Sequence, residues 1–187
     1  MRNIIIGTAI AAALALPQVC HAAVNDAADN GFSVTETVHI AAAPDKVYGT
    51  LVTPSRWWSP VHTFSKSAAN ISLEARAGGC WCETLSNGGS VQHLTVVFAS
   101  PGQALVMRGP LGPLQGLGVD GALTIELKAA GGGTDLTATY NVGGYLKDGL
   151  TSWAQPVDGV LGEQFNRLKA AIETGSPDSK AASKKEH

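Results

Sequence analysis

Two cysteines separated by one residue are the first feature of the sequence that could do chemistry. Cys80 and Cys82 lie in a stretch that is typical of a β-strand, and alternate residues of a strand point to the same face. Their Cα atoms would lie about 6.6–6.8 Å apart, at the upper end of the range that a disulfide spans. A bridge therefore needs a local kink, which the preceding Gly78-Gly79 permits. In an oxidising compartment such a bridge could be redox-active.

A metal site is the second interpretation of these cysteines. If the turn at 87–88 sets an even hairpin, Cys82 lies opposite His93, and two thiols and one imidazole share a face. Zinc would need a fourth ligand or a water, for which His62 is the candidate. A one-residue bulge at Gly89 would break this pairing. The third and simplest interpretation makes both cysteines small apolar residues, bridged or not, and predicts neither metal nor cofactor.

An aromatic stretch offers a different chemistry, that of holding an apolar molecule. Trp57, Trp58, His62 and Phe64 follow one another closely. The tryptophans either wedge this segment against a sheet as core or line the mouth of a cavity, where an indole offers a large apolar face with one polar atom.

No combination of nucleophile, base and acid is recognisable in the sequence. It contains neither a nucleophile elbow nor a His-Glu-x-x-His helix, and no phosphate loop or dinucleotide fingerprint. Glu83, Asp120 and Glu126 are scattered over predicted strands without identifiable partners. The sequence therefore predicts no catalytic residue.

The elements that must position these residues follow from hydrophobic periodicity. Period-two alternation predicts a first strand over 32–40, and Pro44 with apolar spacings of three and four predicts a short helix over 44–52, with a further helical turn at 55–59. A helix of about 20 residues with a wide apolar stripe begins near Leu150. Between them, Gly-rich turns separate predicted strands at 71–76, 80–85, 91–99, 104–108, 118–128 and 134–142.

The two ends of the chain carry different signals. Arg2, the apolar run 4–16 and the small residues before Ala23 predict a secretory signal peptide over 1–22, cleaved near Ala22 or Ala23. The run falls short of the roughly 20 apolar residues that span a membrane. We expect a polar linker over 23–31 and a disordered tail over 174–187, which leaves one domain over 32–173.

The balance of basic and acidic residues limits the classes of partner that the protein can bind. The 13 Lys and Arg, one of which is Arg2, face 15 Asp and Glu, so the mature chain is mildly acidic. Phosphate backbones need clustered Lys and Arg. We therefore expect no nucleic-acid partner, no stable membrane insertion after signal cleavage, and a location in the periplasm or outside the cell.

Several motifs, in their order along the chain, resemble one superfamily. They are the segment 38–48 with its Ala-x-x-Pro-x-x-Val-Tyr pattern, Trp57-Trp58, the segment 78–83 and the closing 162–168. Over nearly all of 33–173 the chain is similar to the START/polyketide-cyclase/birch-pollen-allergen superfamily, called SRPBCC, and in particular to its Aha-type co-chaperone-like and polyketide-cyclase-like bacterial branch. The resemblance implies an α+β helix-grip fold, with a curved antiparallel sheet of about six to seven strands wrapped around a long C-terminal helix and two short helices after the first strand.

The resemblance also implies a cavity between the sheet and the terminal helix, since its members bind lipids, sterols or aromatic products, cyclise polyketides or contact a chaperone. An exported chain does not meet a cytoplasmic chaperone, so we expect a binding protein for a small hydrophobic or aromatic molecule. An enzyme of cyclase, dehydratase or hydrolase type on the same cavity is the first alternative, and a thiol-redox or metal protein built on Cys80 and Cys82 is the second. The expected ligand-binding residues are Trp57, Trp58, His62, Trp81, Leu94, Met107, Tyr140, Leu161 and Phe165.

Overall fold

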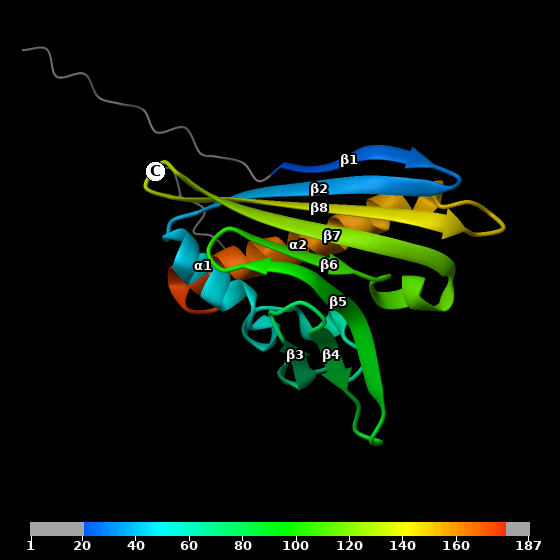
Figure 1. Cartoon of the computed structure of the whole chain (residues 1–187), viewed down its shortest axis with the longest axis horizontal. Coiled ribbons are helices and arrows are strands. Elements are labelled where there is room, and N and C mark those ends of the chain that lie inside the picture. The colour runs from blue at the N-terminus through cyan, green and yellow to red at the C-terminus, as the bar shows by residue number, and fades with distance from the viewer. Residues whose placement is uncertain (1–20, 179–187) are drawn as a thin grey trace, which may run out of the picture.

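The computed structural model describes residues 21–178, and in it a long helix packs on one face of an eight-stranded antiparallel sheet (Figure 1). The predicted α+β helix-grip fold is confirmed. The helices are α1 (Pro44–Leu51) and α2 (Ala154–Thr174). The strands are β1 (His21–Ala28), β2 (Gly31–Ile40), β3 (Ile71–Leu73), β4 (Cys80–Thr84), β5 (Ser90–Ser100), β6 (Ala104–Arg108), β7 (Gly118–Ala130) and β8 (Gly133–Tyr145).

The strands lie in the order β1-β2-β8-β7-β6-β5-β4-β3. The first long strand therefore pairs with the last, and the remaining strands follow as a meander. The β7–β8 hairpin turns at Gly131-Gly132, whose φ angles of 54° and 80° are readily adopted only without a side chain. Alternate residues of β2 are buried, among them Val34, Val38 and Ile40, so one face of the sheet forms the core.

Residues 23–31 are not the linker that the sequence predicted. Residues 21–28 form β1, which pairs with β2 so that Ala23 lies opposite Thr35 and Val24 opposite Val34. Val24 and Ala27 are partly buried against the core. The strand is rich in Ala, Asn and Asp, which have low β-propensity. Pairing with the otherwise free edge of β2 outweighs that preference, and the sheet gains a strand beyond the predicted six to seven.

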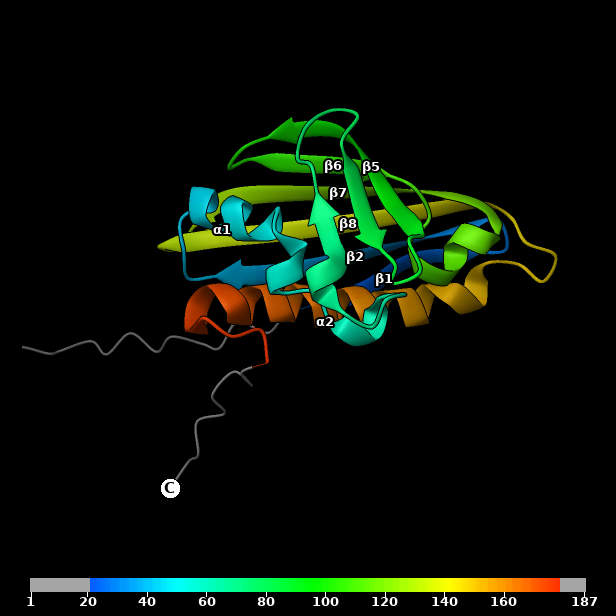
Figure 2. The same ribbon diagram turned by 90° about the horizontal axis from the view of Figure 1, so that it is seen from below.

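The segment after α1 is more irregular than the single helical turn expected at 55–59. It contains three 3₁₀ turns, at Pro54–Arg56, Pro60–His62 and Ala68–Asn70. Prolines begin the first two, where a missing N–H is harmless. These turns lead the chain past the middle of α2 to the short strands β3 and β4 (Figure 2).

Helix α2 packs against β2 and β1 and crosses one face of the sheet obliquely (Figures 1 and 2). Its buried stripe includes Leu161, Phe165, Leu168 and Ile172, at the spacing of three and four that the sequence predicted. The helix ends at Gly175, which adopts a left-handed φ of 83°. The core therefore lies between this stripe and the inner face of the sheet.

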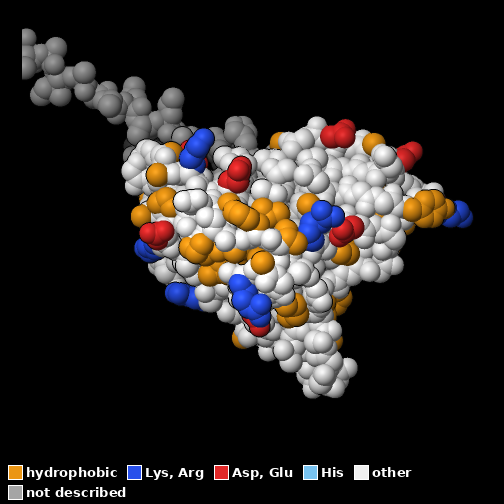
Figure 3. Space-filling model, in the orientation of Figure 1, with side chains coloured by type: hydrophobic (Ala, Val, Ile, Leu, Met, Phe, Trp, Pro, Cys, Tyr) orange, Lys and Arg blue, Asp and Glu red, His pale blue; other side chains and the backbone are white. Residues whose placement is uncertain are grey.

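The face of the sheet turned away from α2 shows acidic and basic side chains interspersed with apolar ones (Figure 3). Among residues 21–178, no helix is both long and apolar enough to cross a membrane. The predicted signal peptide lies almost entirely, and the tail beyond residue 178 entirely, outside the described residues.

Candidate ligand-binding pocket

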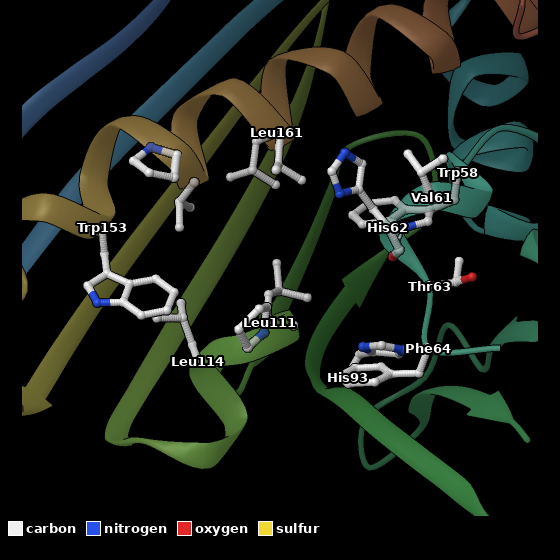
Figure 4. A pocket seen from close by; sticks show the side chains of 15 residues that line it. Trp58, Val61, His62, Thr63, Phe64, His93, Leu111, Leu114, Trp153 and Leu161 are labelled. Carbon is white, nitrogen blue, oxygen red and sulfur yellow. Dashed lines mark hydrogen bonds between the residues drawn. The ribbon is translucent and has the colours of Figure 1, made fainter. Parts of the chain in front are cut away.

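A cavity of about 340 Å³ opens between the first half of α2, the 3₁₀ segment and a loop that precedes β7. Figure 4 shows Trp153 at one end, His93 and Phe64 at the other, Leu161 on the helix side and Leu111 with Leu114 on the loop side. The full lining is Trp58, Val61, His62, Thr63, Phe64, His93, Leu111, Gly112, Pro113, Leu114, Trp153, Pro156, Val157, Val160 and Leu161. Most of this surface is aliphatic or aromatic, as in sites for small apolar molecules.

Hydrogen bonds hold the 3₁₀ segment against both helices. The indole N–H of Trp57 donates to the carbonyl of Thr50 at the end of α1, at 3.0 Å. The indole N–H of Trp58 donates to the carbonyl of His62 at 2.9 Å. The backbone N–H of Ser59 donates to Oε1 of Gln164 on α2, at 2.7 Å and fully buried. The pocket wall is therefore attached to the helix that it faces.

An aromatic cluster lies behind this wall and corrects part of the predicted site. Trp57 stacks on Phe165 with ring centroids 6.3 Å apart, and Trp58 meets Trp81 edge-on at 5.0 Å. Of these four residues only Trp58 lines the cavity. Trp57, Trp81 and Phe165 are at most 2 % exposed and belong to the core, because the 3₁₀ segment buries their rings between itself, β4 and α2.

Tyr140, Leu94 and Met107 were also predicted to bind the ligand, and all three are core residues that do not line the cavity. Tyr140 instead supports the loop that does. Its hydroxyl donates to the carbonyl of Gly109 and accepts from the N–H of Leu111, each at 2.9 Å. Burial raises the pKa of Tyr140, so its proton stays in place and the loop stays attached to β8.

Glu83 and His93 form a buried pair at one end of the cavity. Nε2 of His93 lies 3.0 Å from Oε2 of Glu83, and both side chains are at most 7 % exposed. The carboxylate also accepts from the backbone N–H of Phe64, at 3.2 Å, and of Ser65. Burial alone would raise the pKa of Glu83, but these hydrogen bonds outweigh it and lower the pKa. Glu83 is therefore ionised, and it positions His93 and the wall segment together.

A second histidine–carboxylate pair lies nearer the surface. Nε2 of His62 is 3.1 Å from Oε2 of Glu163 on α2, and both side chains are about a third or more exposed. His62, Trp58 and Leu161 are the predicted site residues that the structure brings together in the pocket.

The two cysteines are joined in a disulfide on strand β4, with their Cα atoms 5.4 Å apart. This separation is shorter than that of a straight strand, so the chain bends locally at the bridge, where the pairing of β4 with β5 is also irregular. The turn closes with Thr84 opposite Ser90, so that Cys82 lies opposite Gln92 and not His93.

The metal trio of Cys80, Cys82 and His93 is thereby wrong. His93 is the extra residue of a bulge and lies on the buried face with Leu94, whereas the half-buried cysteines alternate with Trp81 and Glu83 and point to the opposite face. Among residues 21–178, no three His, Cys, Asp or Glu side chains are grouped as a metal site.

A pair of buried acids lies outside the pocket, between β2 and α2. Glu36 is fully buried, and a Cβ added to Gly162 on α2 would lie 3.3 Å from both its carboxyl oxygens. Neither oxygen has a hydrogen-bond donor among the described residues. Burial, and then the nearby Asp158 carboxyl, raises the pKa of Glu36 to about 8, and burial raises the pKa of Asp158. Glu36 is therefore protonated at neutral pH.

Sequence reasoning missed several lining residues, among them Trp153, Leu111, Leu114 and Val160. A visible signal was the Gly- and Pro-rich loop before β7, whose leucines have no strand to belong to. The contact between Glu83 and His93 depends on the bulge in β5, so the spacing of the two residues in the sequence does not predict it.

Comparison with known proteins identifies the family of this chain. The sequence profile of the family described as polyketide cyclase/dehydrase and lipid transport matches residues 31–173. No curated protein matches the chain.

Solved structures share the fold at low identity. The Aha1 dimer from Colwellia psychrerythraea has a TM-score of 0.53 at 18 % identity, over 76 % of this chain and 97 % of that one. CalU16 from Micromonospora echinospora has 0.54 at 16 %, over 88 % of each chain. A conserved protein of unknown function from Enterococcus faecalis has 0.57 at 16 %, over 86 % of this chain and 80 % of that one. Fold and sequence profile agree, and this chain belongs to the polyketide cyclase/dehydrase and lipid transport family.

Proposed function

We propose that this protein is exported and binds one small hydrophobic or aromatic molecule in the pocket beside α2. The observation that carries the proposal is the lining: three aromatic side chains, Trp58, Phe64 and Trp153, and a set of aliphatic ones enclose about 340 Å³. Such a volume fits a molecule of one to a few rings. The family's description, which names polyketide chemistry and lipid transport, supports an apolar ligand.

Exposed apolar residues at the pocket support the same function. Val61 is 77 % exposed and Phe64 52 % exposed, and both line the cavity. When a ligand covers apolar side chains at the mouth of an apolar cavity, their surface is removed from water, and this favours binding.

The binding test uses N-phenyl-1-naphthylamine, whose fluorescence rises in apolar surroundings. We expect saturable binding to the wild type and at least a tenfold weaker affinity for Val157→Trp, because the indole would fill the cavity from α2. Val97→Trp is the matched control, since Val97 is 49 % exposed on β5 and does not line the pocket. Equal binding by Val157→Trp and the wild type would refute the placement of the ligand.

Export is the other half of the proposal and rests on the N-terminal sequence pattern. Cleavage near Ala22 or Ala23 would remove the start of β1 and keep the pairs from Val24 with Val34 to Ala28 with Gly31. We expect N-terminal sequencing of the protein from a periplasmic fraction to begin at Ala23 or Val24. A chain that begins at Met1 in that fraction would contradict cleavage.

A further inference from the structure

The pocket has one buried polar end. Apart from the tryptophans, its polar lining side chains are His62, Thr63 and His93. Thr63 donates its hydroxyl hydrogen to the carbonyl of Pro60 at 2.8 Å, and His62 pairs with Glu163 near the surface. His93 alone of the three is buried, and it lies against Phe64, with ring centroids 5.9 Å apart, at the end of the cavity opposite Trp153 (Figure 4).

The surroundings of His93 decide which of its nitrogens carries the proton. Nε2 faces the Glu83 carboxylate, which can only accept. The neutral ring therefore carries its hydrogen on Nε2, and Nδ1 keeps a lone pair. No residue among 21–178 makes a hydrogen bond to Nδ1, and Nδ1 is not among the enclosed polar atoms. A ligand in the pocket can reach it.

We propose that Glu83 and His93 form a proton-accepting site, in which His93 Nδ1 takes the hydrogen of a weakly acidic hydroxyl, a phenol or an enol, on an otherwise apolar ligand. This inference rests on the proposed function, since it requires a ligand in the pocket. On full transfer the ligand's O–H bond breaks, its electron pair stays on oxygen, and an Nδ1–H bond forms. The resulting imidazolium lies against the Glu83 carboxylate, which stabilises its charge.

The charges around His93 favour a neutral hydroxyl over an anionic ligand. The titratable groups in or beside the pocket lining are Glu83, which contacts His93, and the pair of His62 with Glu163 nearer the surface. The lining contains neither Lys nor Arg, so a carboxylate or phosphate would meet no fixed positive charge and would lie near Glu83. A neutral O–H group gains a hydrogen bond without that repulsion.

The test compares two probes that share one ring system. 2-Naphthol carries a hydroxyl, and 2-methoxynaphthalene has the same rings without the hydrogen. We expect the full-length protein to bind 2-naphthol about tenfold more tightly, the effect of one good buried hydrogen bond. His93→Phe keeps a planar ring against Phe64 and should abolish this preference, so that the two probes bind the variant with equal affinity.

A second variant tests the role of Glu83 through the tautomer. In Glu83→Gln an amide oxygen at the position of Oε1 still accepts from Ser65, and the NH₂ group takes the place of Oε2. There it loses the hydrogen bond from the Phe64 N–H and donates to His93 Nε2, which moves the ring proton to Nδ1. We expect ¹⁵N imidazole shifts to show an unprotonated Nδ1 in the wild type and a protonated Nδ1 in this variant, with the naphthol preference lost. His39→Gln is the matched control, because His39 pairs with Asp135 at 2.7 Å outside the pocket.

The outcomes separate the two proposals. Equal affinities of both probes for the wild type, or an Nδ1–H tautomer in the free protein, overturn the proton-accepting site and leave the binding proposal in place. Failure of both probes and of N-phenyl-1-naphthylamine to bind overturns the proposed function, and this inference with it.

Discussion

Two glutamates on the inner face of the sheet, Glu83 on β4 and Glu36 on β2, are equally buried and have opposite protonation states. Each is at most 1 % exposed. Glu83 accepts hydrogen bonds from two backbone N–H groups and faces His93. Glu36 has no donor among the described residues and has Asp158 as its neighbour. The pKa of the first is lowered and that of the second is raised to about 8.

The difference shows that burial by itself does not decide the charge of a carboxyl group. Desolvation raises the pKa at both positions, and the supply of donors decides the net result. Donors reach Glu83 because the irregular 3₁₀ segment brings unpaired N–H groups of residues 64 and 65 to it. The N–H groups around Glu36 are already committed to regular pairing between β2 and its neighbours. Irregular backbone therefore supports the anion, and regular backbone does not.

The largest effect is expected from removing the supported anion. Glu83→Ala leaves two backbone N–H groups and the His93 ring without their partner in a buried site. We expect a loss of about 3–5 kcal/mol in the free energy of unfolding, measured by urea denaturation at pH 7. Glu126→Ala is the matched control, since Glu126 is exposed on β7, and it should change stability by about 0.5 kcal/mol or less. A loss for Glu83→Ala as small as that of the control would show that the anion supports nothing.

The effect expected for Glu36 is a change of stability with pH, in the direction opposite to that expected for Glu83. The pKa of Glu36 is raised from 4.5 to about 8 on folding, so between these values the folded state holds a proton that the unfolded state has released. The contribution of Glu36 to the free energy of unfolding is therefore full below pH 4.5. It is lost as the pH rises toward 8, by at most about 1.4 kcal/mol per pH unit. Glu83, with a lowered pKa, contributes above its ordinary value of 4.5 and loses that contribution as the pH falls.

Glu36→Gln removes the titrating group and nearly keeps its shape, so its stability should decline less between pH 5 and pH 8 than that of the wild type. The measurement is urea denaturation at several pH values, with Glu126→Gln as control. Parallel pH profiles for Glu36→Gln and the wild type would mean that Glu36 is ionised in the folded protein.

Regular elements were predictable from the sequence because their residues repeat with the period of the structure. The strand over 32–40 and the stripe of α2 through Leu161, Phe165 and Leu168 both appear where the pattern placed them. Strand β1 did not, because its pairing edge is supplied by β2 and its own residues carry little β-preference.

The site was harder to predict because core and cavity share one face of the sheet. Alternation alone does not distinguish Met107 or Tyr140, which are core, from residues that line a cavity. The distinction comes from the 3₁₀ segment, which covers Trp57, Trp81 and Phe165 and leaves Trp58 at the wall. His93 reached the pocket through a bulge that shifts the register by one residue.

The smallest effect is expected at the disulfide, which lies on the same strand as Glu83. The bridge joins residues two apart, and closing so short a loop removes little freedom from the unfolded chain, about 1.5 kcal/mol or less. Cys80 and Cys82 point away from the face of Trp81 and Glu83. The double variant Cys80→Ser, Cys82→Ser should therefore lower the melting midpoint only slightly. Its naphthol preference and the tautomer of His93 should match those of the wild type, because the hydrogen bonds to Glu83 come from residues 64 and 65 and not from the bridge.

If instead the variant, or the reduced wild type, lost the preference while remaining folded, the kink made by the disulfide would be needed to hold Glu83 in place. Opening the bridge would then change what the pocket binds, and the half-buried cysteines would control the anion from the other face of the sheet.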